Sequence, residues 1–292
     1  MPRQSVVEIQ KQNGTNTDCF LIISRKGSGD MILTIDIGNT NIVLGGFVED
    51  KLTFISRIST NARKTDAEYA TKIRSILALY EVDKTQVSGA IISSVVPPLT
   101  RIIKNAVKMV YDVDALVVGP GIKTGINLLA DNPVEVGADL ICACVAAYNL
   151  YTPPVLIIDM GTATKIMLVD DKACFSGVTI IPGVELSLKA LAGGTAQLPQ
   201  ISLEAPPKVM GRNTEDCMRS GIMFGSASMI DGMIDRIEEE IGYRADLVAT
   251  GGLSTAIIPH CKHEIKLDDD LILKGLLIIY NKNTANKKCK KN

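Results

Sequence analysis

The alternation of apolar and polar positions divides the chain after residue 30 into short strands and longer helices. Two stretches, 31–59 and 155–181, are apolar runs of strand length separated by turn residues, and each predicts three strands joined by hairpins. Single strands are expected over 87–95, 115–118 and 245–250. Helical spacing predicts helices over 66–80, from Pro97 or Pro98 onward, and over 133–148, 183–191, 214–241 and 271–280. This order of elements predicts an α/β protein with mixed sheets flanked by helices.

One short pattern occurs twice along the chain. Residues 32–41 read Ile-Leu-Thr-Ile-Asp-Ile-Gly-Asn-Thr-Asn, and residues 155–164 read Val-Leu-Ile-Ile-Asp-Met-Gly-Thr-Ala-Thr. Each copy has four residues of strand character, then Asp-x-Gly, then side chains with hydroxyl or amide groups. The repeat predicts two similar domains, 31–150 and 151–282, related by duplication and separated near Pro153-Pro154. A ligand is expected in the cleft between them.

The Asp-x-Gly turns have the chemistry of half a phosphate site and half a cation site. Glycine allows close approach of a ligand, and backbone N–H groups with Thr and Asn side chains can surround an anion. A carboxylate beside a phosphate is repulsive unless a cation lies between them, and Mg²⁺ is commonly held in this way. The alternative is that each Asp-Gly only ends a strand before a hairpin. Occurrence of the pattern in both halves favours the phosphate site.

The stretch 214–241 predicts the longest helix, and its apolar positions form one stripe that is rich in methionine. These positions are Met218, Ile222, Met229, Met233, Ile237 and Ile241. Such a stripe is typical either of a helix packed on a core or of a subunit interface, and the sequence leaves both open.

Composition limits the classes of function. The 292 residues carry a net charge of −1, so no excess of positive charge favours nucleic acid or a membrane surface as a partner. No apolar run has the length of a membrane span. Seven cysteines without framework spacing indicate a reduced, cytoplasmic protein. Residues 1–30 are expected to be a disordered N-terminal extension, and 283–292 a basic C-terminal tail.

Taken together, the motifs resemble those of the type III pantothenate kinases, which belong to the acetate kinase/Hsp70/actin-like superfamily. The resemblance covers about residues 31–281 and rests on the order and spacing of its motifs more than on any one of them. In chain order the matching segments are Asp36–Asn41, Lys123–Gly125, Asp131–Pro133, Gly137–Asp139, Asp159–Thr164, Pro182-Gly183, Thr195–Pro199, Gly211–Thr214 and Thr250–Gly252. The resemblance implies two duplicated actin-like, ribonuclease H-like domains.

The resemblance also implies a reaction and roles for residues. ATP would phosphorylate the primary hydroxyl of pantothenate, the first step toward coenzyme A. Asp139 would be the general base, Asp36 would hold Mg²⁺ through water, and Asp159 would bind a monovalent cation, K⁺ or NH₄⁺. ATP would be bound by Asp36, Ile37, Gly38, Asn39, Thr40, Asn41, Ile42, Val43 and Thr162, and pantothenate by Gly137, Ala138, Asp139, Leu140 and Thr214. Without the resemblance, Asp139 reads as an acidic residue favoured at a helix start, and Thr214 as a helix cap.

The chain departs from the family at one position of its substrate motif. The family motif is Gly-x-Asp-Arg, whereas residue 140 is leucine, which cannot bind the pantothenate carboxylate as arginine does. We hypothesise that Lys123, Lys165 or Arg212 supplies the missing charge. Two other functions stay open: a catalytically weak relative that acts as a binding or regulatory accessory protein, and a different kinase or phosphatase of the superfamily. The resemblance also implies a homodimer with the substrate pocket near the subunit interface.

Overall fold

The computed structural model describes residues 30–194, 199 and 201–288, and this part of the chain forms two β-sheets. The first sheet has five strands in the order β3-β2-β1-β4-β5. They are β1 (Met31–Ile37), β2 (Asn41–Val48), β3 (Lys51–Ser59), β4 (Val87–Ser94) and β5 (Leu116–Val117). β1 pairs antiparallel with β2 and parallel with β4, so the sheet is mixed.

The second sheet repeats the topology of the first. Its strands are β6 (Asn127–Leu128), β7 (Val155–Met160), β8 (Ala163–Val169), β9 (Cys174–Pro182), β10 (Asp246–Thr250) and β11 (Lys266–Leu267), in the order β11-β10-β7-β8-β9-β6. β7 pairs antiparallel with β8 and parallel with β10, as β1 does with β2 and β4. Apart from the edge strand β6, the two sheets correspond strand for strand. The predicted duplication is therefore confirmed.

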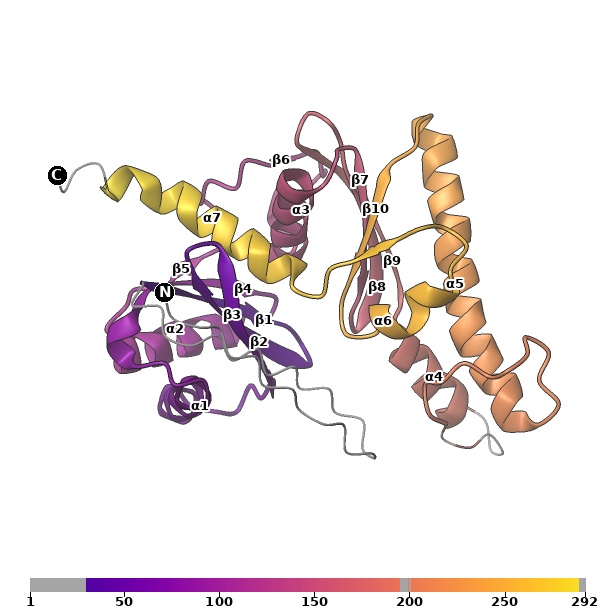
Figure 1. The fold of residues 1–292 in the computed structure, drawn as a ribbon, viewed down its shortest axis with the longest axis horizontal. Helices are drawn as coiled ribbons and strands as arrows, with labels where there is room; N and C mark the ends of the chain where they lie inside the picture. Colours follow the sequence, from indigo (N-terminus) through magenta and orange to yellow (C-terminus); the bar gives the residue numbers. More distant parts are fainter. Residues whose placement is uncertain (1–29, 195–198, 200, 289–292) are drawn as a thin grey trace, which may run out of the picture.

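Two helices lie between the sheets. α3 (Ala138–Leu150) and α7 (Leu271–Lys288) pack against each other in the middle of the molecule (Figure 1). α7 follows the second sheet in sequence but packs on β1, β2 and β4 of the first. A Cβ on Gly275 of α7 would overlap the Cys142 carbonyl oxygen of α3. Only glycine allows the two backbones to approach so closely.

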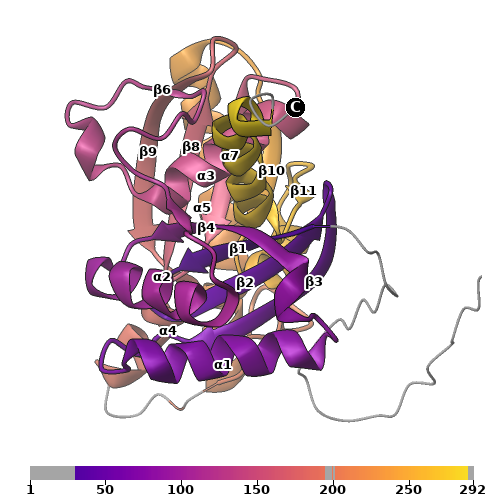
Figure 2. The same cartoon turned by 90° about the vertical axis from the view of Figure 1, so that its left-hand side faces the viewer.

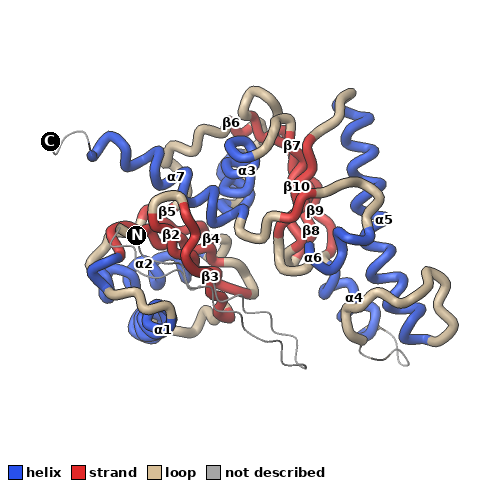
Figure 3. Tube along the Cα trace, in the orientation of Figure 1, coloured by secondary structure: helices blue, strands red, loops and turns tan. Residues whose placement is uncertain are grey.

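The remaining helices cover the outer faces. α1 (Asp66–Leu79) and α2 (Pro97–Tyr111) lie side by side on one face of the first sheet (Figure 2), where they bury Leu33, Ile35 and Ile37 of β1. α4 (Val184–Gly193), α5 (Thr214–Ile241) and α6 (Ser254–Ile257) cover the outer face of the second sheet (Figure 3). The order is helices, sheet, helices, sheet, helices.

Alternation along β7 fixes which helix lies on which face. Val155 and Ile157 pack in the core that contains α3, whereas Leu156 and Ile158 pack in the core that contains α5. Along α5 the residues buried in this second core are Met223, Ala227, Ile230 and Ile234. Of the six stripe residues only Met218 is buried, and the other five are partly buried beside that core. The stripe thus lies along the border of the core, and its part in a subunit interface stays a prediction.

Helix starts follow local sequence signals. Thr65 and Glu68 form a capping box at α1, and Pro97 and Pro98 occupy the first turn of α2. The predicted helix over 133–148 is wrong at its start, because Pro133–Glu135 forms a short 3₁₀ turn, η2, and α3 begins only at Ala138. Gly137 lies between them with an extended backbone, φ −57° and ψ 142°. Two further 3₁₀ turns are η1 (Lys84–Gln86) and η3 (Ile258–His260).

Some predictions fall on residues outside the described part of the chain. These are the N-terminal extension up to residue 29, residues 195–198 of one family motif, and the end of the basic tail, 289–292. Within the described residues, no helix has the length and apolar character needed to cross a membrane.

Candidate active site

The first Asp-x-Gly turn follows β1 in the first sheet. Asp36 is the penultimate residue of β1, and the turn closes through a hydrogen bond of 3.0 Å from the Gly38 N–H to the Asn41 carbonyl. Thr60, the residue after β3, donates a hydrogen bond from its hydroxyl to the Gly38 carbonyl at 2.7 Å. The side chains of residues 39–41 are exposed, whereas Ile37 and Ile42 are buried in the core with α1 and α2. Residues 38–41 can thus present backbone and polar groups to a ligand.

The second turn, Gly161-Thr162, follows β7 in the second sheet and is closely backed by two other glycines. A Cβ on Gly183 would overlap the Thr162 carbonyl oxygen. Gly251 has φ +95°, and a Cβ there would lie 2.6 Å from the Met160 carbonyl oxygen. These glycines let the segments before α4 and after β10 pack directly on the turn.

A hydrogen bond joins the two turns. The hydroxyl oxygens of Thr40 and Thr162 are 3.0 Å apart, and both side chains are exposed. The two predicted phosphate motifs, one at the end of a strand in each sheet, therefore face each other. An ATP site that uses both motifs would require this arrangement.

Asp139 lies in the first turn of α3, between the two sheets, and contacts the second one. Its carboxylate oxygen Oδ2 accepts a hydrogen bond from Lys165 Nζ at 2.7 Å. The same ammonium lies 2.9 Å from Asp159 Oδ2. Asp159 and Lys165 are directly paired residues of β7 and β8, so their side chains emerge side by side toward α3. Lys165 thus bridges the predicted base and the second Asp-x-Gly motif.

Charges in the site interact strongly because the groups are shielded from water. Burial, followed by the negative charge of Asp139, raises the pKa of Asp36 from 3.8 to about 7, and the neighbouring Ser93 hydroxyl acts in the opposite direction. Burial also raises the pKa of Asp159, although Lys165 lowers it. Burial disfavours the ammonium of Lys165, but Asp159 and Asp139 outweigh that effect and raise its pKa.

Within the described residues, no group of three or more His, Cys, Asp or Glu side chains is arranged to hold a metal ion. A divalent cation at Asp36 would therefore need other oxygen ligands. Mg²⁺ is commonly bound in this manner, by one or two carboxylates together with water and substrate phosphates. The Asp36 carboxylate, whose negative charge is disfavoured by burial and by the nearby Asp139 and Asp159, fits such an ion.

Several predicted substrate residues lie elsewhere. The Leu140 side chain is only 8% exposed and packs in the core with α3 and α7. Thr214 begins α5, where Asn213 caps the helix by accepting a hydrogen bond from the Asp216 N–H at 2.8 Å. Because α5 and α3 cover opposite faces of the second sheet, one chain does not bring Thr214 to Asp139. Gly137 and Ala138 adjoin Asp139 at the start of α3.

Of the three cations considered for the pantothenate carboxylate, only Lys165 touches Asp139. Lys123 is exposed in a loop whose backbone is held by Asn283 of α7 through hydrogen bonds of 3.0 and 2.9 Å. Arg212 is exposed just before α5.

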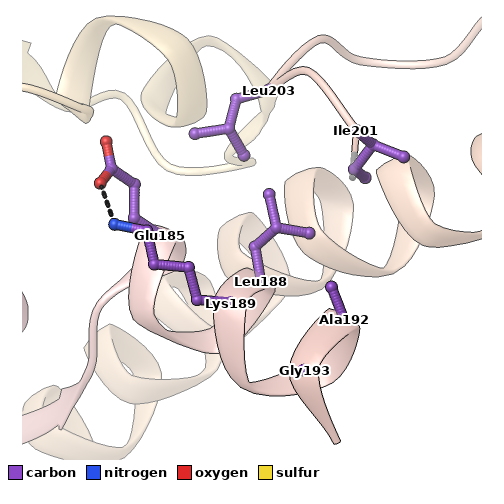
Figure 4. A pocket seen from close by; sticks show the side chains of 7 residues that line it. All are labelled: Glu185, Leu188, Lys189, Ala192, Gly193, Ile201 and Leu203. Atoms are coloured by element: carbon purple, nitrogen blue, oxygen red, sulfur yellow. Dashed lines mark hydrogen bonds and ion pairs between the residues drawn. The ribbon is translucent and has the colours of Figure 1, made fainter. Parts of the chain in front are cut away.

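A pocket of about 590 Å³ lies away from these residues, between α4 and the segment that follows it (Figure 4). Its walls include Glu185, Leu188 and Leu203, and Lys189 forms an ion pair with Glu185 at 3.3 Å. None of the residues that line it belongs to the predicted site.

Sequence reasoning missed two contributions. Ser93, opposite Asp36 in β4, was signalled by two adjacent serines at the end of that strand. The link from Lys165 to Asp159 was signalled by their spacing across a tight hairpin, which makes them cross-strand partners.

Comparison with solved structures identifies the class of fold. A Baf family transcriptional activator from Campylobacter jejuni matches with a TM-score of 0.54 and 20% identity, over 87% of this chain and 99% of the other. Component A of the (R)-2-hydroxyglutaryl-CoA dehydratase of Acidaminococcus fermentans gives a TM-score of 0.52 and 16% identity, over 88% and 100%. MreB 5 of Spiroplasma citri gives 0.51 and 9%, over 90% and 98%. The chain has the actin-like fold.

Sequence comparison then identifies the family. The family model for type III pantothenate kinase matches residues 32–236. Type III pantothenate kinases from an Exiguobacterium species and from Brevibacillus brevis are each 42% identical, over 87% of this chain and 99% and 100% of theirs. The enzyme of that name from Halalkalibacterium halodurans is 41% identical, over 87% and 100%. The chain belongs to the type III pantothenate kinase family, as its motifs predicted.

Proposed function

We propose that this chain transfers the γ-phosphoryl group of ATP to the primary hydroxyl of pantothenate, the first step of coenzyme A biosynthesis. The observation that carries the proposal is the position of Asp139, which contacts the second phosphate motif through Lys165 and lies close enough to Asp36 to raise its pKa. Family membership supports the choice of substrate. A carboxylate beside two facing phosphate turns is suited to accept the proton of an attacking hydroxyl.

The ATP phosphates would lie against the backbone and polar groups of residues 36–43 and against Thr162. A kinase of this family uses ATP with a divalent metal, and we assign that metal as Mg²⁺ at Asp36. The ion would neutralise phosphate charge when bound. The chain's own groups position the reactants: the two turns orient the phosphates, and Asp139 is held in place at the start of α3.

For the pantothenate carboxylate we assign Lys123 or Arg212, because Lys165 is already bound by two carboxylates and Leu140 is in the core. We also propose a homodimer. Thr214 lies on the far side of the second sheet from Asp139 of the same chain. In a homodimer, the second subunit would supply its Thr214 to the substrate site at Asp139. The enzyme is assigned to the cytoplasm, in keeping with free thiols at the described cysteines, which are Cys142, Cys144, Cys174, Cys217 and Cys261.

The accessory-protein alternative has no support beyond fold. The Campylobacter jejuni activator shares only 20% identity, which reports the fold alone. The chain carries Asp36, Asp139, Asp159 and Thr162 at the motif positions, and Lys165 links Asp139 to Asp159, which favours an active kinase.

The test is ATP-dependent phosphorylation of pantothenate with Mg²⁺, by wild type and Asp139→Asn. The variant keeps the shape of the side chain but cannot act as a base, so kcat should fall by about a hundredfold or more. Asp50→Asn is the matched control, since Asp50 is exposed in the turn between β2 and β3. Phosphorylation of other alcohols but not of pantothenate, or an Asp139→Asn variant as fast as Asp50→Asn, would contradict the proposal.

A further inference from the structure

The active site contains an ammonium group locked between two carboxylates. Lys165 Nζ is 2.7 Å from Asp139 Oδ2 and 2.9 Å from Asp159 Oδ2. These are the lengths of charge-assisted hydrogen bonds. All three side chains are largely buried, with 18% of Lys165, 14% of Asp139 and 8% of Asp159 exposed. Lys165 is therefore a fixed part of the site.

The duplication shows that this cation is an addition to one half only. Asp36 in β1 and Asp159 in β7 occupy equivalent positions in the two sheets. The residue paired with Asp159 across the hairpin is Lys165, whereas the residue paired with Asp36 is Val43. The first aspartate is left for a cation from solution, and the second already has a cation supplied by the chain.

We propose that Lys165 is a built-in monovalent cation, which joins Asp159 to Asp139 and makes K⁺ or NH₄⁺ unnecessary at Asp159. The family resemblance predicted one of those ions there, and the residues present do not fit it. The ammonium already occupies the side of Asp159 that faces Asp139, and a second cation there would be repelled by it at close range. This inference depends on the proposed function in one respect, the role of Asp139 as the general base for phosphoryl transfer.

Lys165 acts in this scheme as a positioning residue. It holds the Asp139 carboxylate at a fixed distance from the second phosphate turn, and its tether to β8 makes that contact independent of salt composition. An exchangeable ion would instead be present only in proportion to its concentration and affinity.

The experiment compares wild type, Lys165→Ala and the control Lys172→Ala in KCl, NH₄Cl and NaCl at equal ionic strength. Lys172 is exposed in the turn between β8 and β9. Wild-type and control turnover should agree among the three salts to within about twofold, since a tethered ammonium does not depend on the free ion. Lys165→Ala should lose at least about tenfold in kcat in NaCl and recover part of it in KCl or NH₄Cl, when those ions enter the emptied position.

Thermal unfolding of the same proteins without ATP or pantothenate is a second readout. The wild-type Tm should be equal in KCl and NaCl, whereas Lys165→Ala should be more stable in KCl. Wild-type turnover or wild-type Tm that depends on K⁺ overturns the proposal, even if the variant does not fold. A variant indifferent to the choice of salt in both assays overturns it as well. Absence of pantothenate turnover in every salt would reject the proposed function, and the unfolding data would still decide the role of Lys165.

Discussion

Replacement of Asp36 by asparagine should change how the stability of the metal-free protein depends on pH. Burial and the charge of Asp139 raise the pKa of Asp36 from 3.8 to about 7. Between those values the folded protein holds a proton that the unfolded chain releases. The carboxyl group therefore contributes stability that is fully present below about pH 4 and is lost as the pH rises through about 7.

The magnitude follows from the size of the shift. A displacement of about three pKa units at about 1.4 kcal/mol per unit amounts to about 4 kcal/mol, which is an upper value. Asp36→Asn has no titrating carboxyl group at this position and so lacks this pH-dependent contribution. The difference in free energy of unfolding, wild type minus variant, should therefore fall by up to about 4 kcal/mol as the pH rises from about 4 to 7. The contribution of Asp159 is present in both proteins and largely cancels.

The assay is urea unfolding of wild type, Asp36→Asn and Asp50→Asn over that pH range in the presence of a chelator. Asp50→Asn should run parallel to wild type, because its side chain is exposed in a turn. Parallel curves for wild type and Asp36→Asn would refute the reasoning, since Asp36 would then titrate alike in the folded and unfolded states. Mg²⁺ with ATP should flatten the wild-type curve, because the metal binds the ionised carboxylate.

The remaining predictions concern the central helix pair and the substrate carboxylate. Gly275→Ala should destabilise the protein by about 1–3 kcal/mol in urea unfolding, because the new methyl group overlaps the Cys142 carbonyl. The same change at Gly221 in α5, where nothing lies within 4 Å, should be neutral or stabilising, and equal effects at the two sites would contradict the close contact. Lys123→Ala or Arg212→Ala should raise the KM for pantothenate about tenfold with little change in kcat, as expected for a lost charge-assisted hydrogen bond. If both variants keep the wild-type KM, neither Lys123 nor Arg212 binds the pantothenate carboxylate.

The sequence was sufficient to predict the repeated unit because strand ends carry local signals. Runs of Val, Ile and Leu before Asp36 and Asp159, with glycine two residues later, specify a buried strand and a tight turn without any long-range contact. The same reasoning predicted the mixed sheets, since three adjacent strands joined by short turns can only be antiparallel. Motif order then identified the family.

The relative placement of the elements could not be predicted from the sequence. Every residue of β7 is buried, so its pattern shows no alternation that would assign α3 to one face and α5 to the other. α3 is also buried nearly all round, and its spacing does not reveal that Leu140 points into the core. Likewise, nothing in residues 271–288 indicates that α7 returns to the first sheet. The placement of these helices depends on which surfaces pack together. The spacing of apolar residues, every 3.6 residues in a helix or every 2 in a strand, shows only that one surface of the element is buried.

The surroundings of Asp139 in this chain differ from what its sequence motif alone suggests. The family motif carries an arginine directly after the aspartate, on the same helix, whereas this chain has Leu140, which packs inward. A positive charge is nevertheless present 2.7 Å from the Asp139 carboxylate, and it comes from β8 through Lys165. Read along the chain, the substitution at residue 140 looks like the loss of a cation from the site. Read in space, a cation still lies beside the base, and it can no longer bind substrate freely because Asp159 holds it. In this chain Lys165 compensates the charge of Asp139, and the recognition of the pantothenate carboxylate has to come from a separate cation.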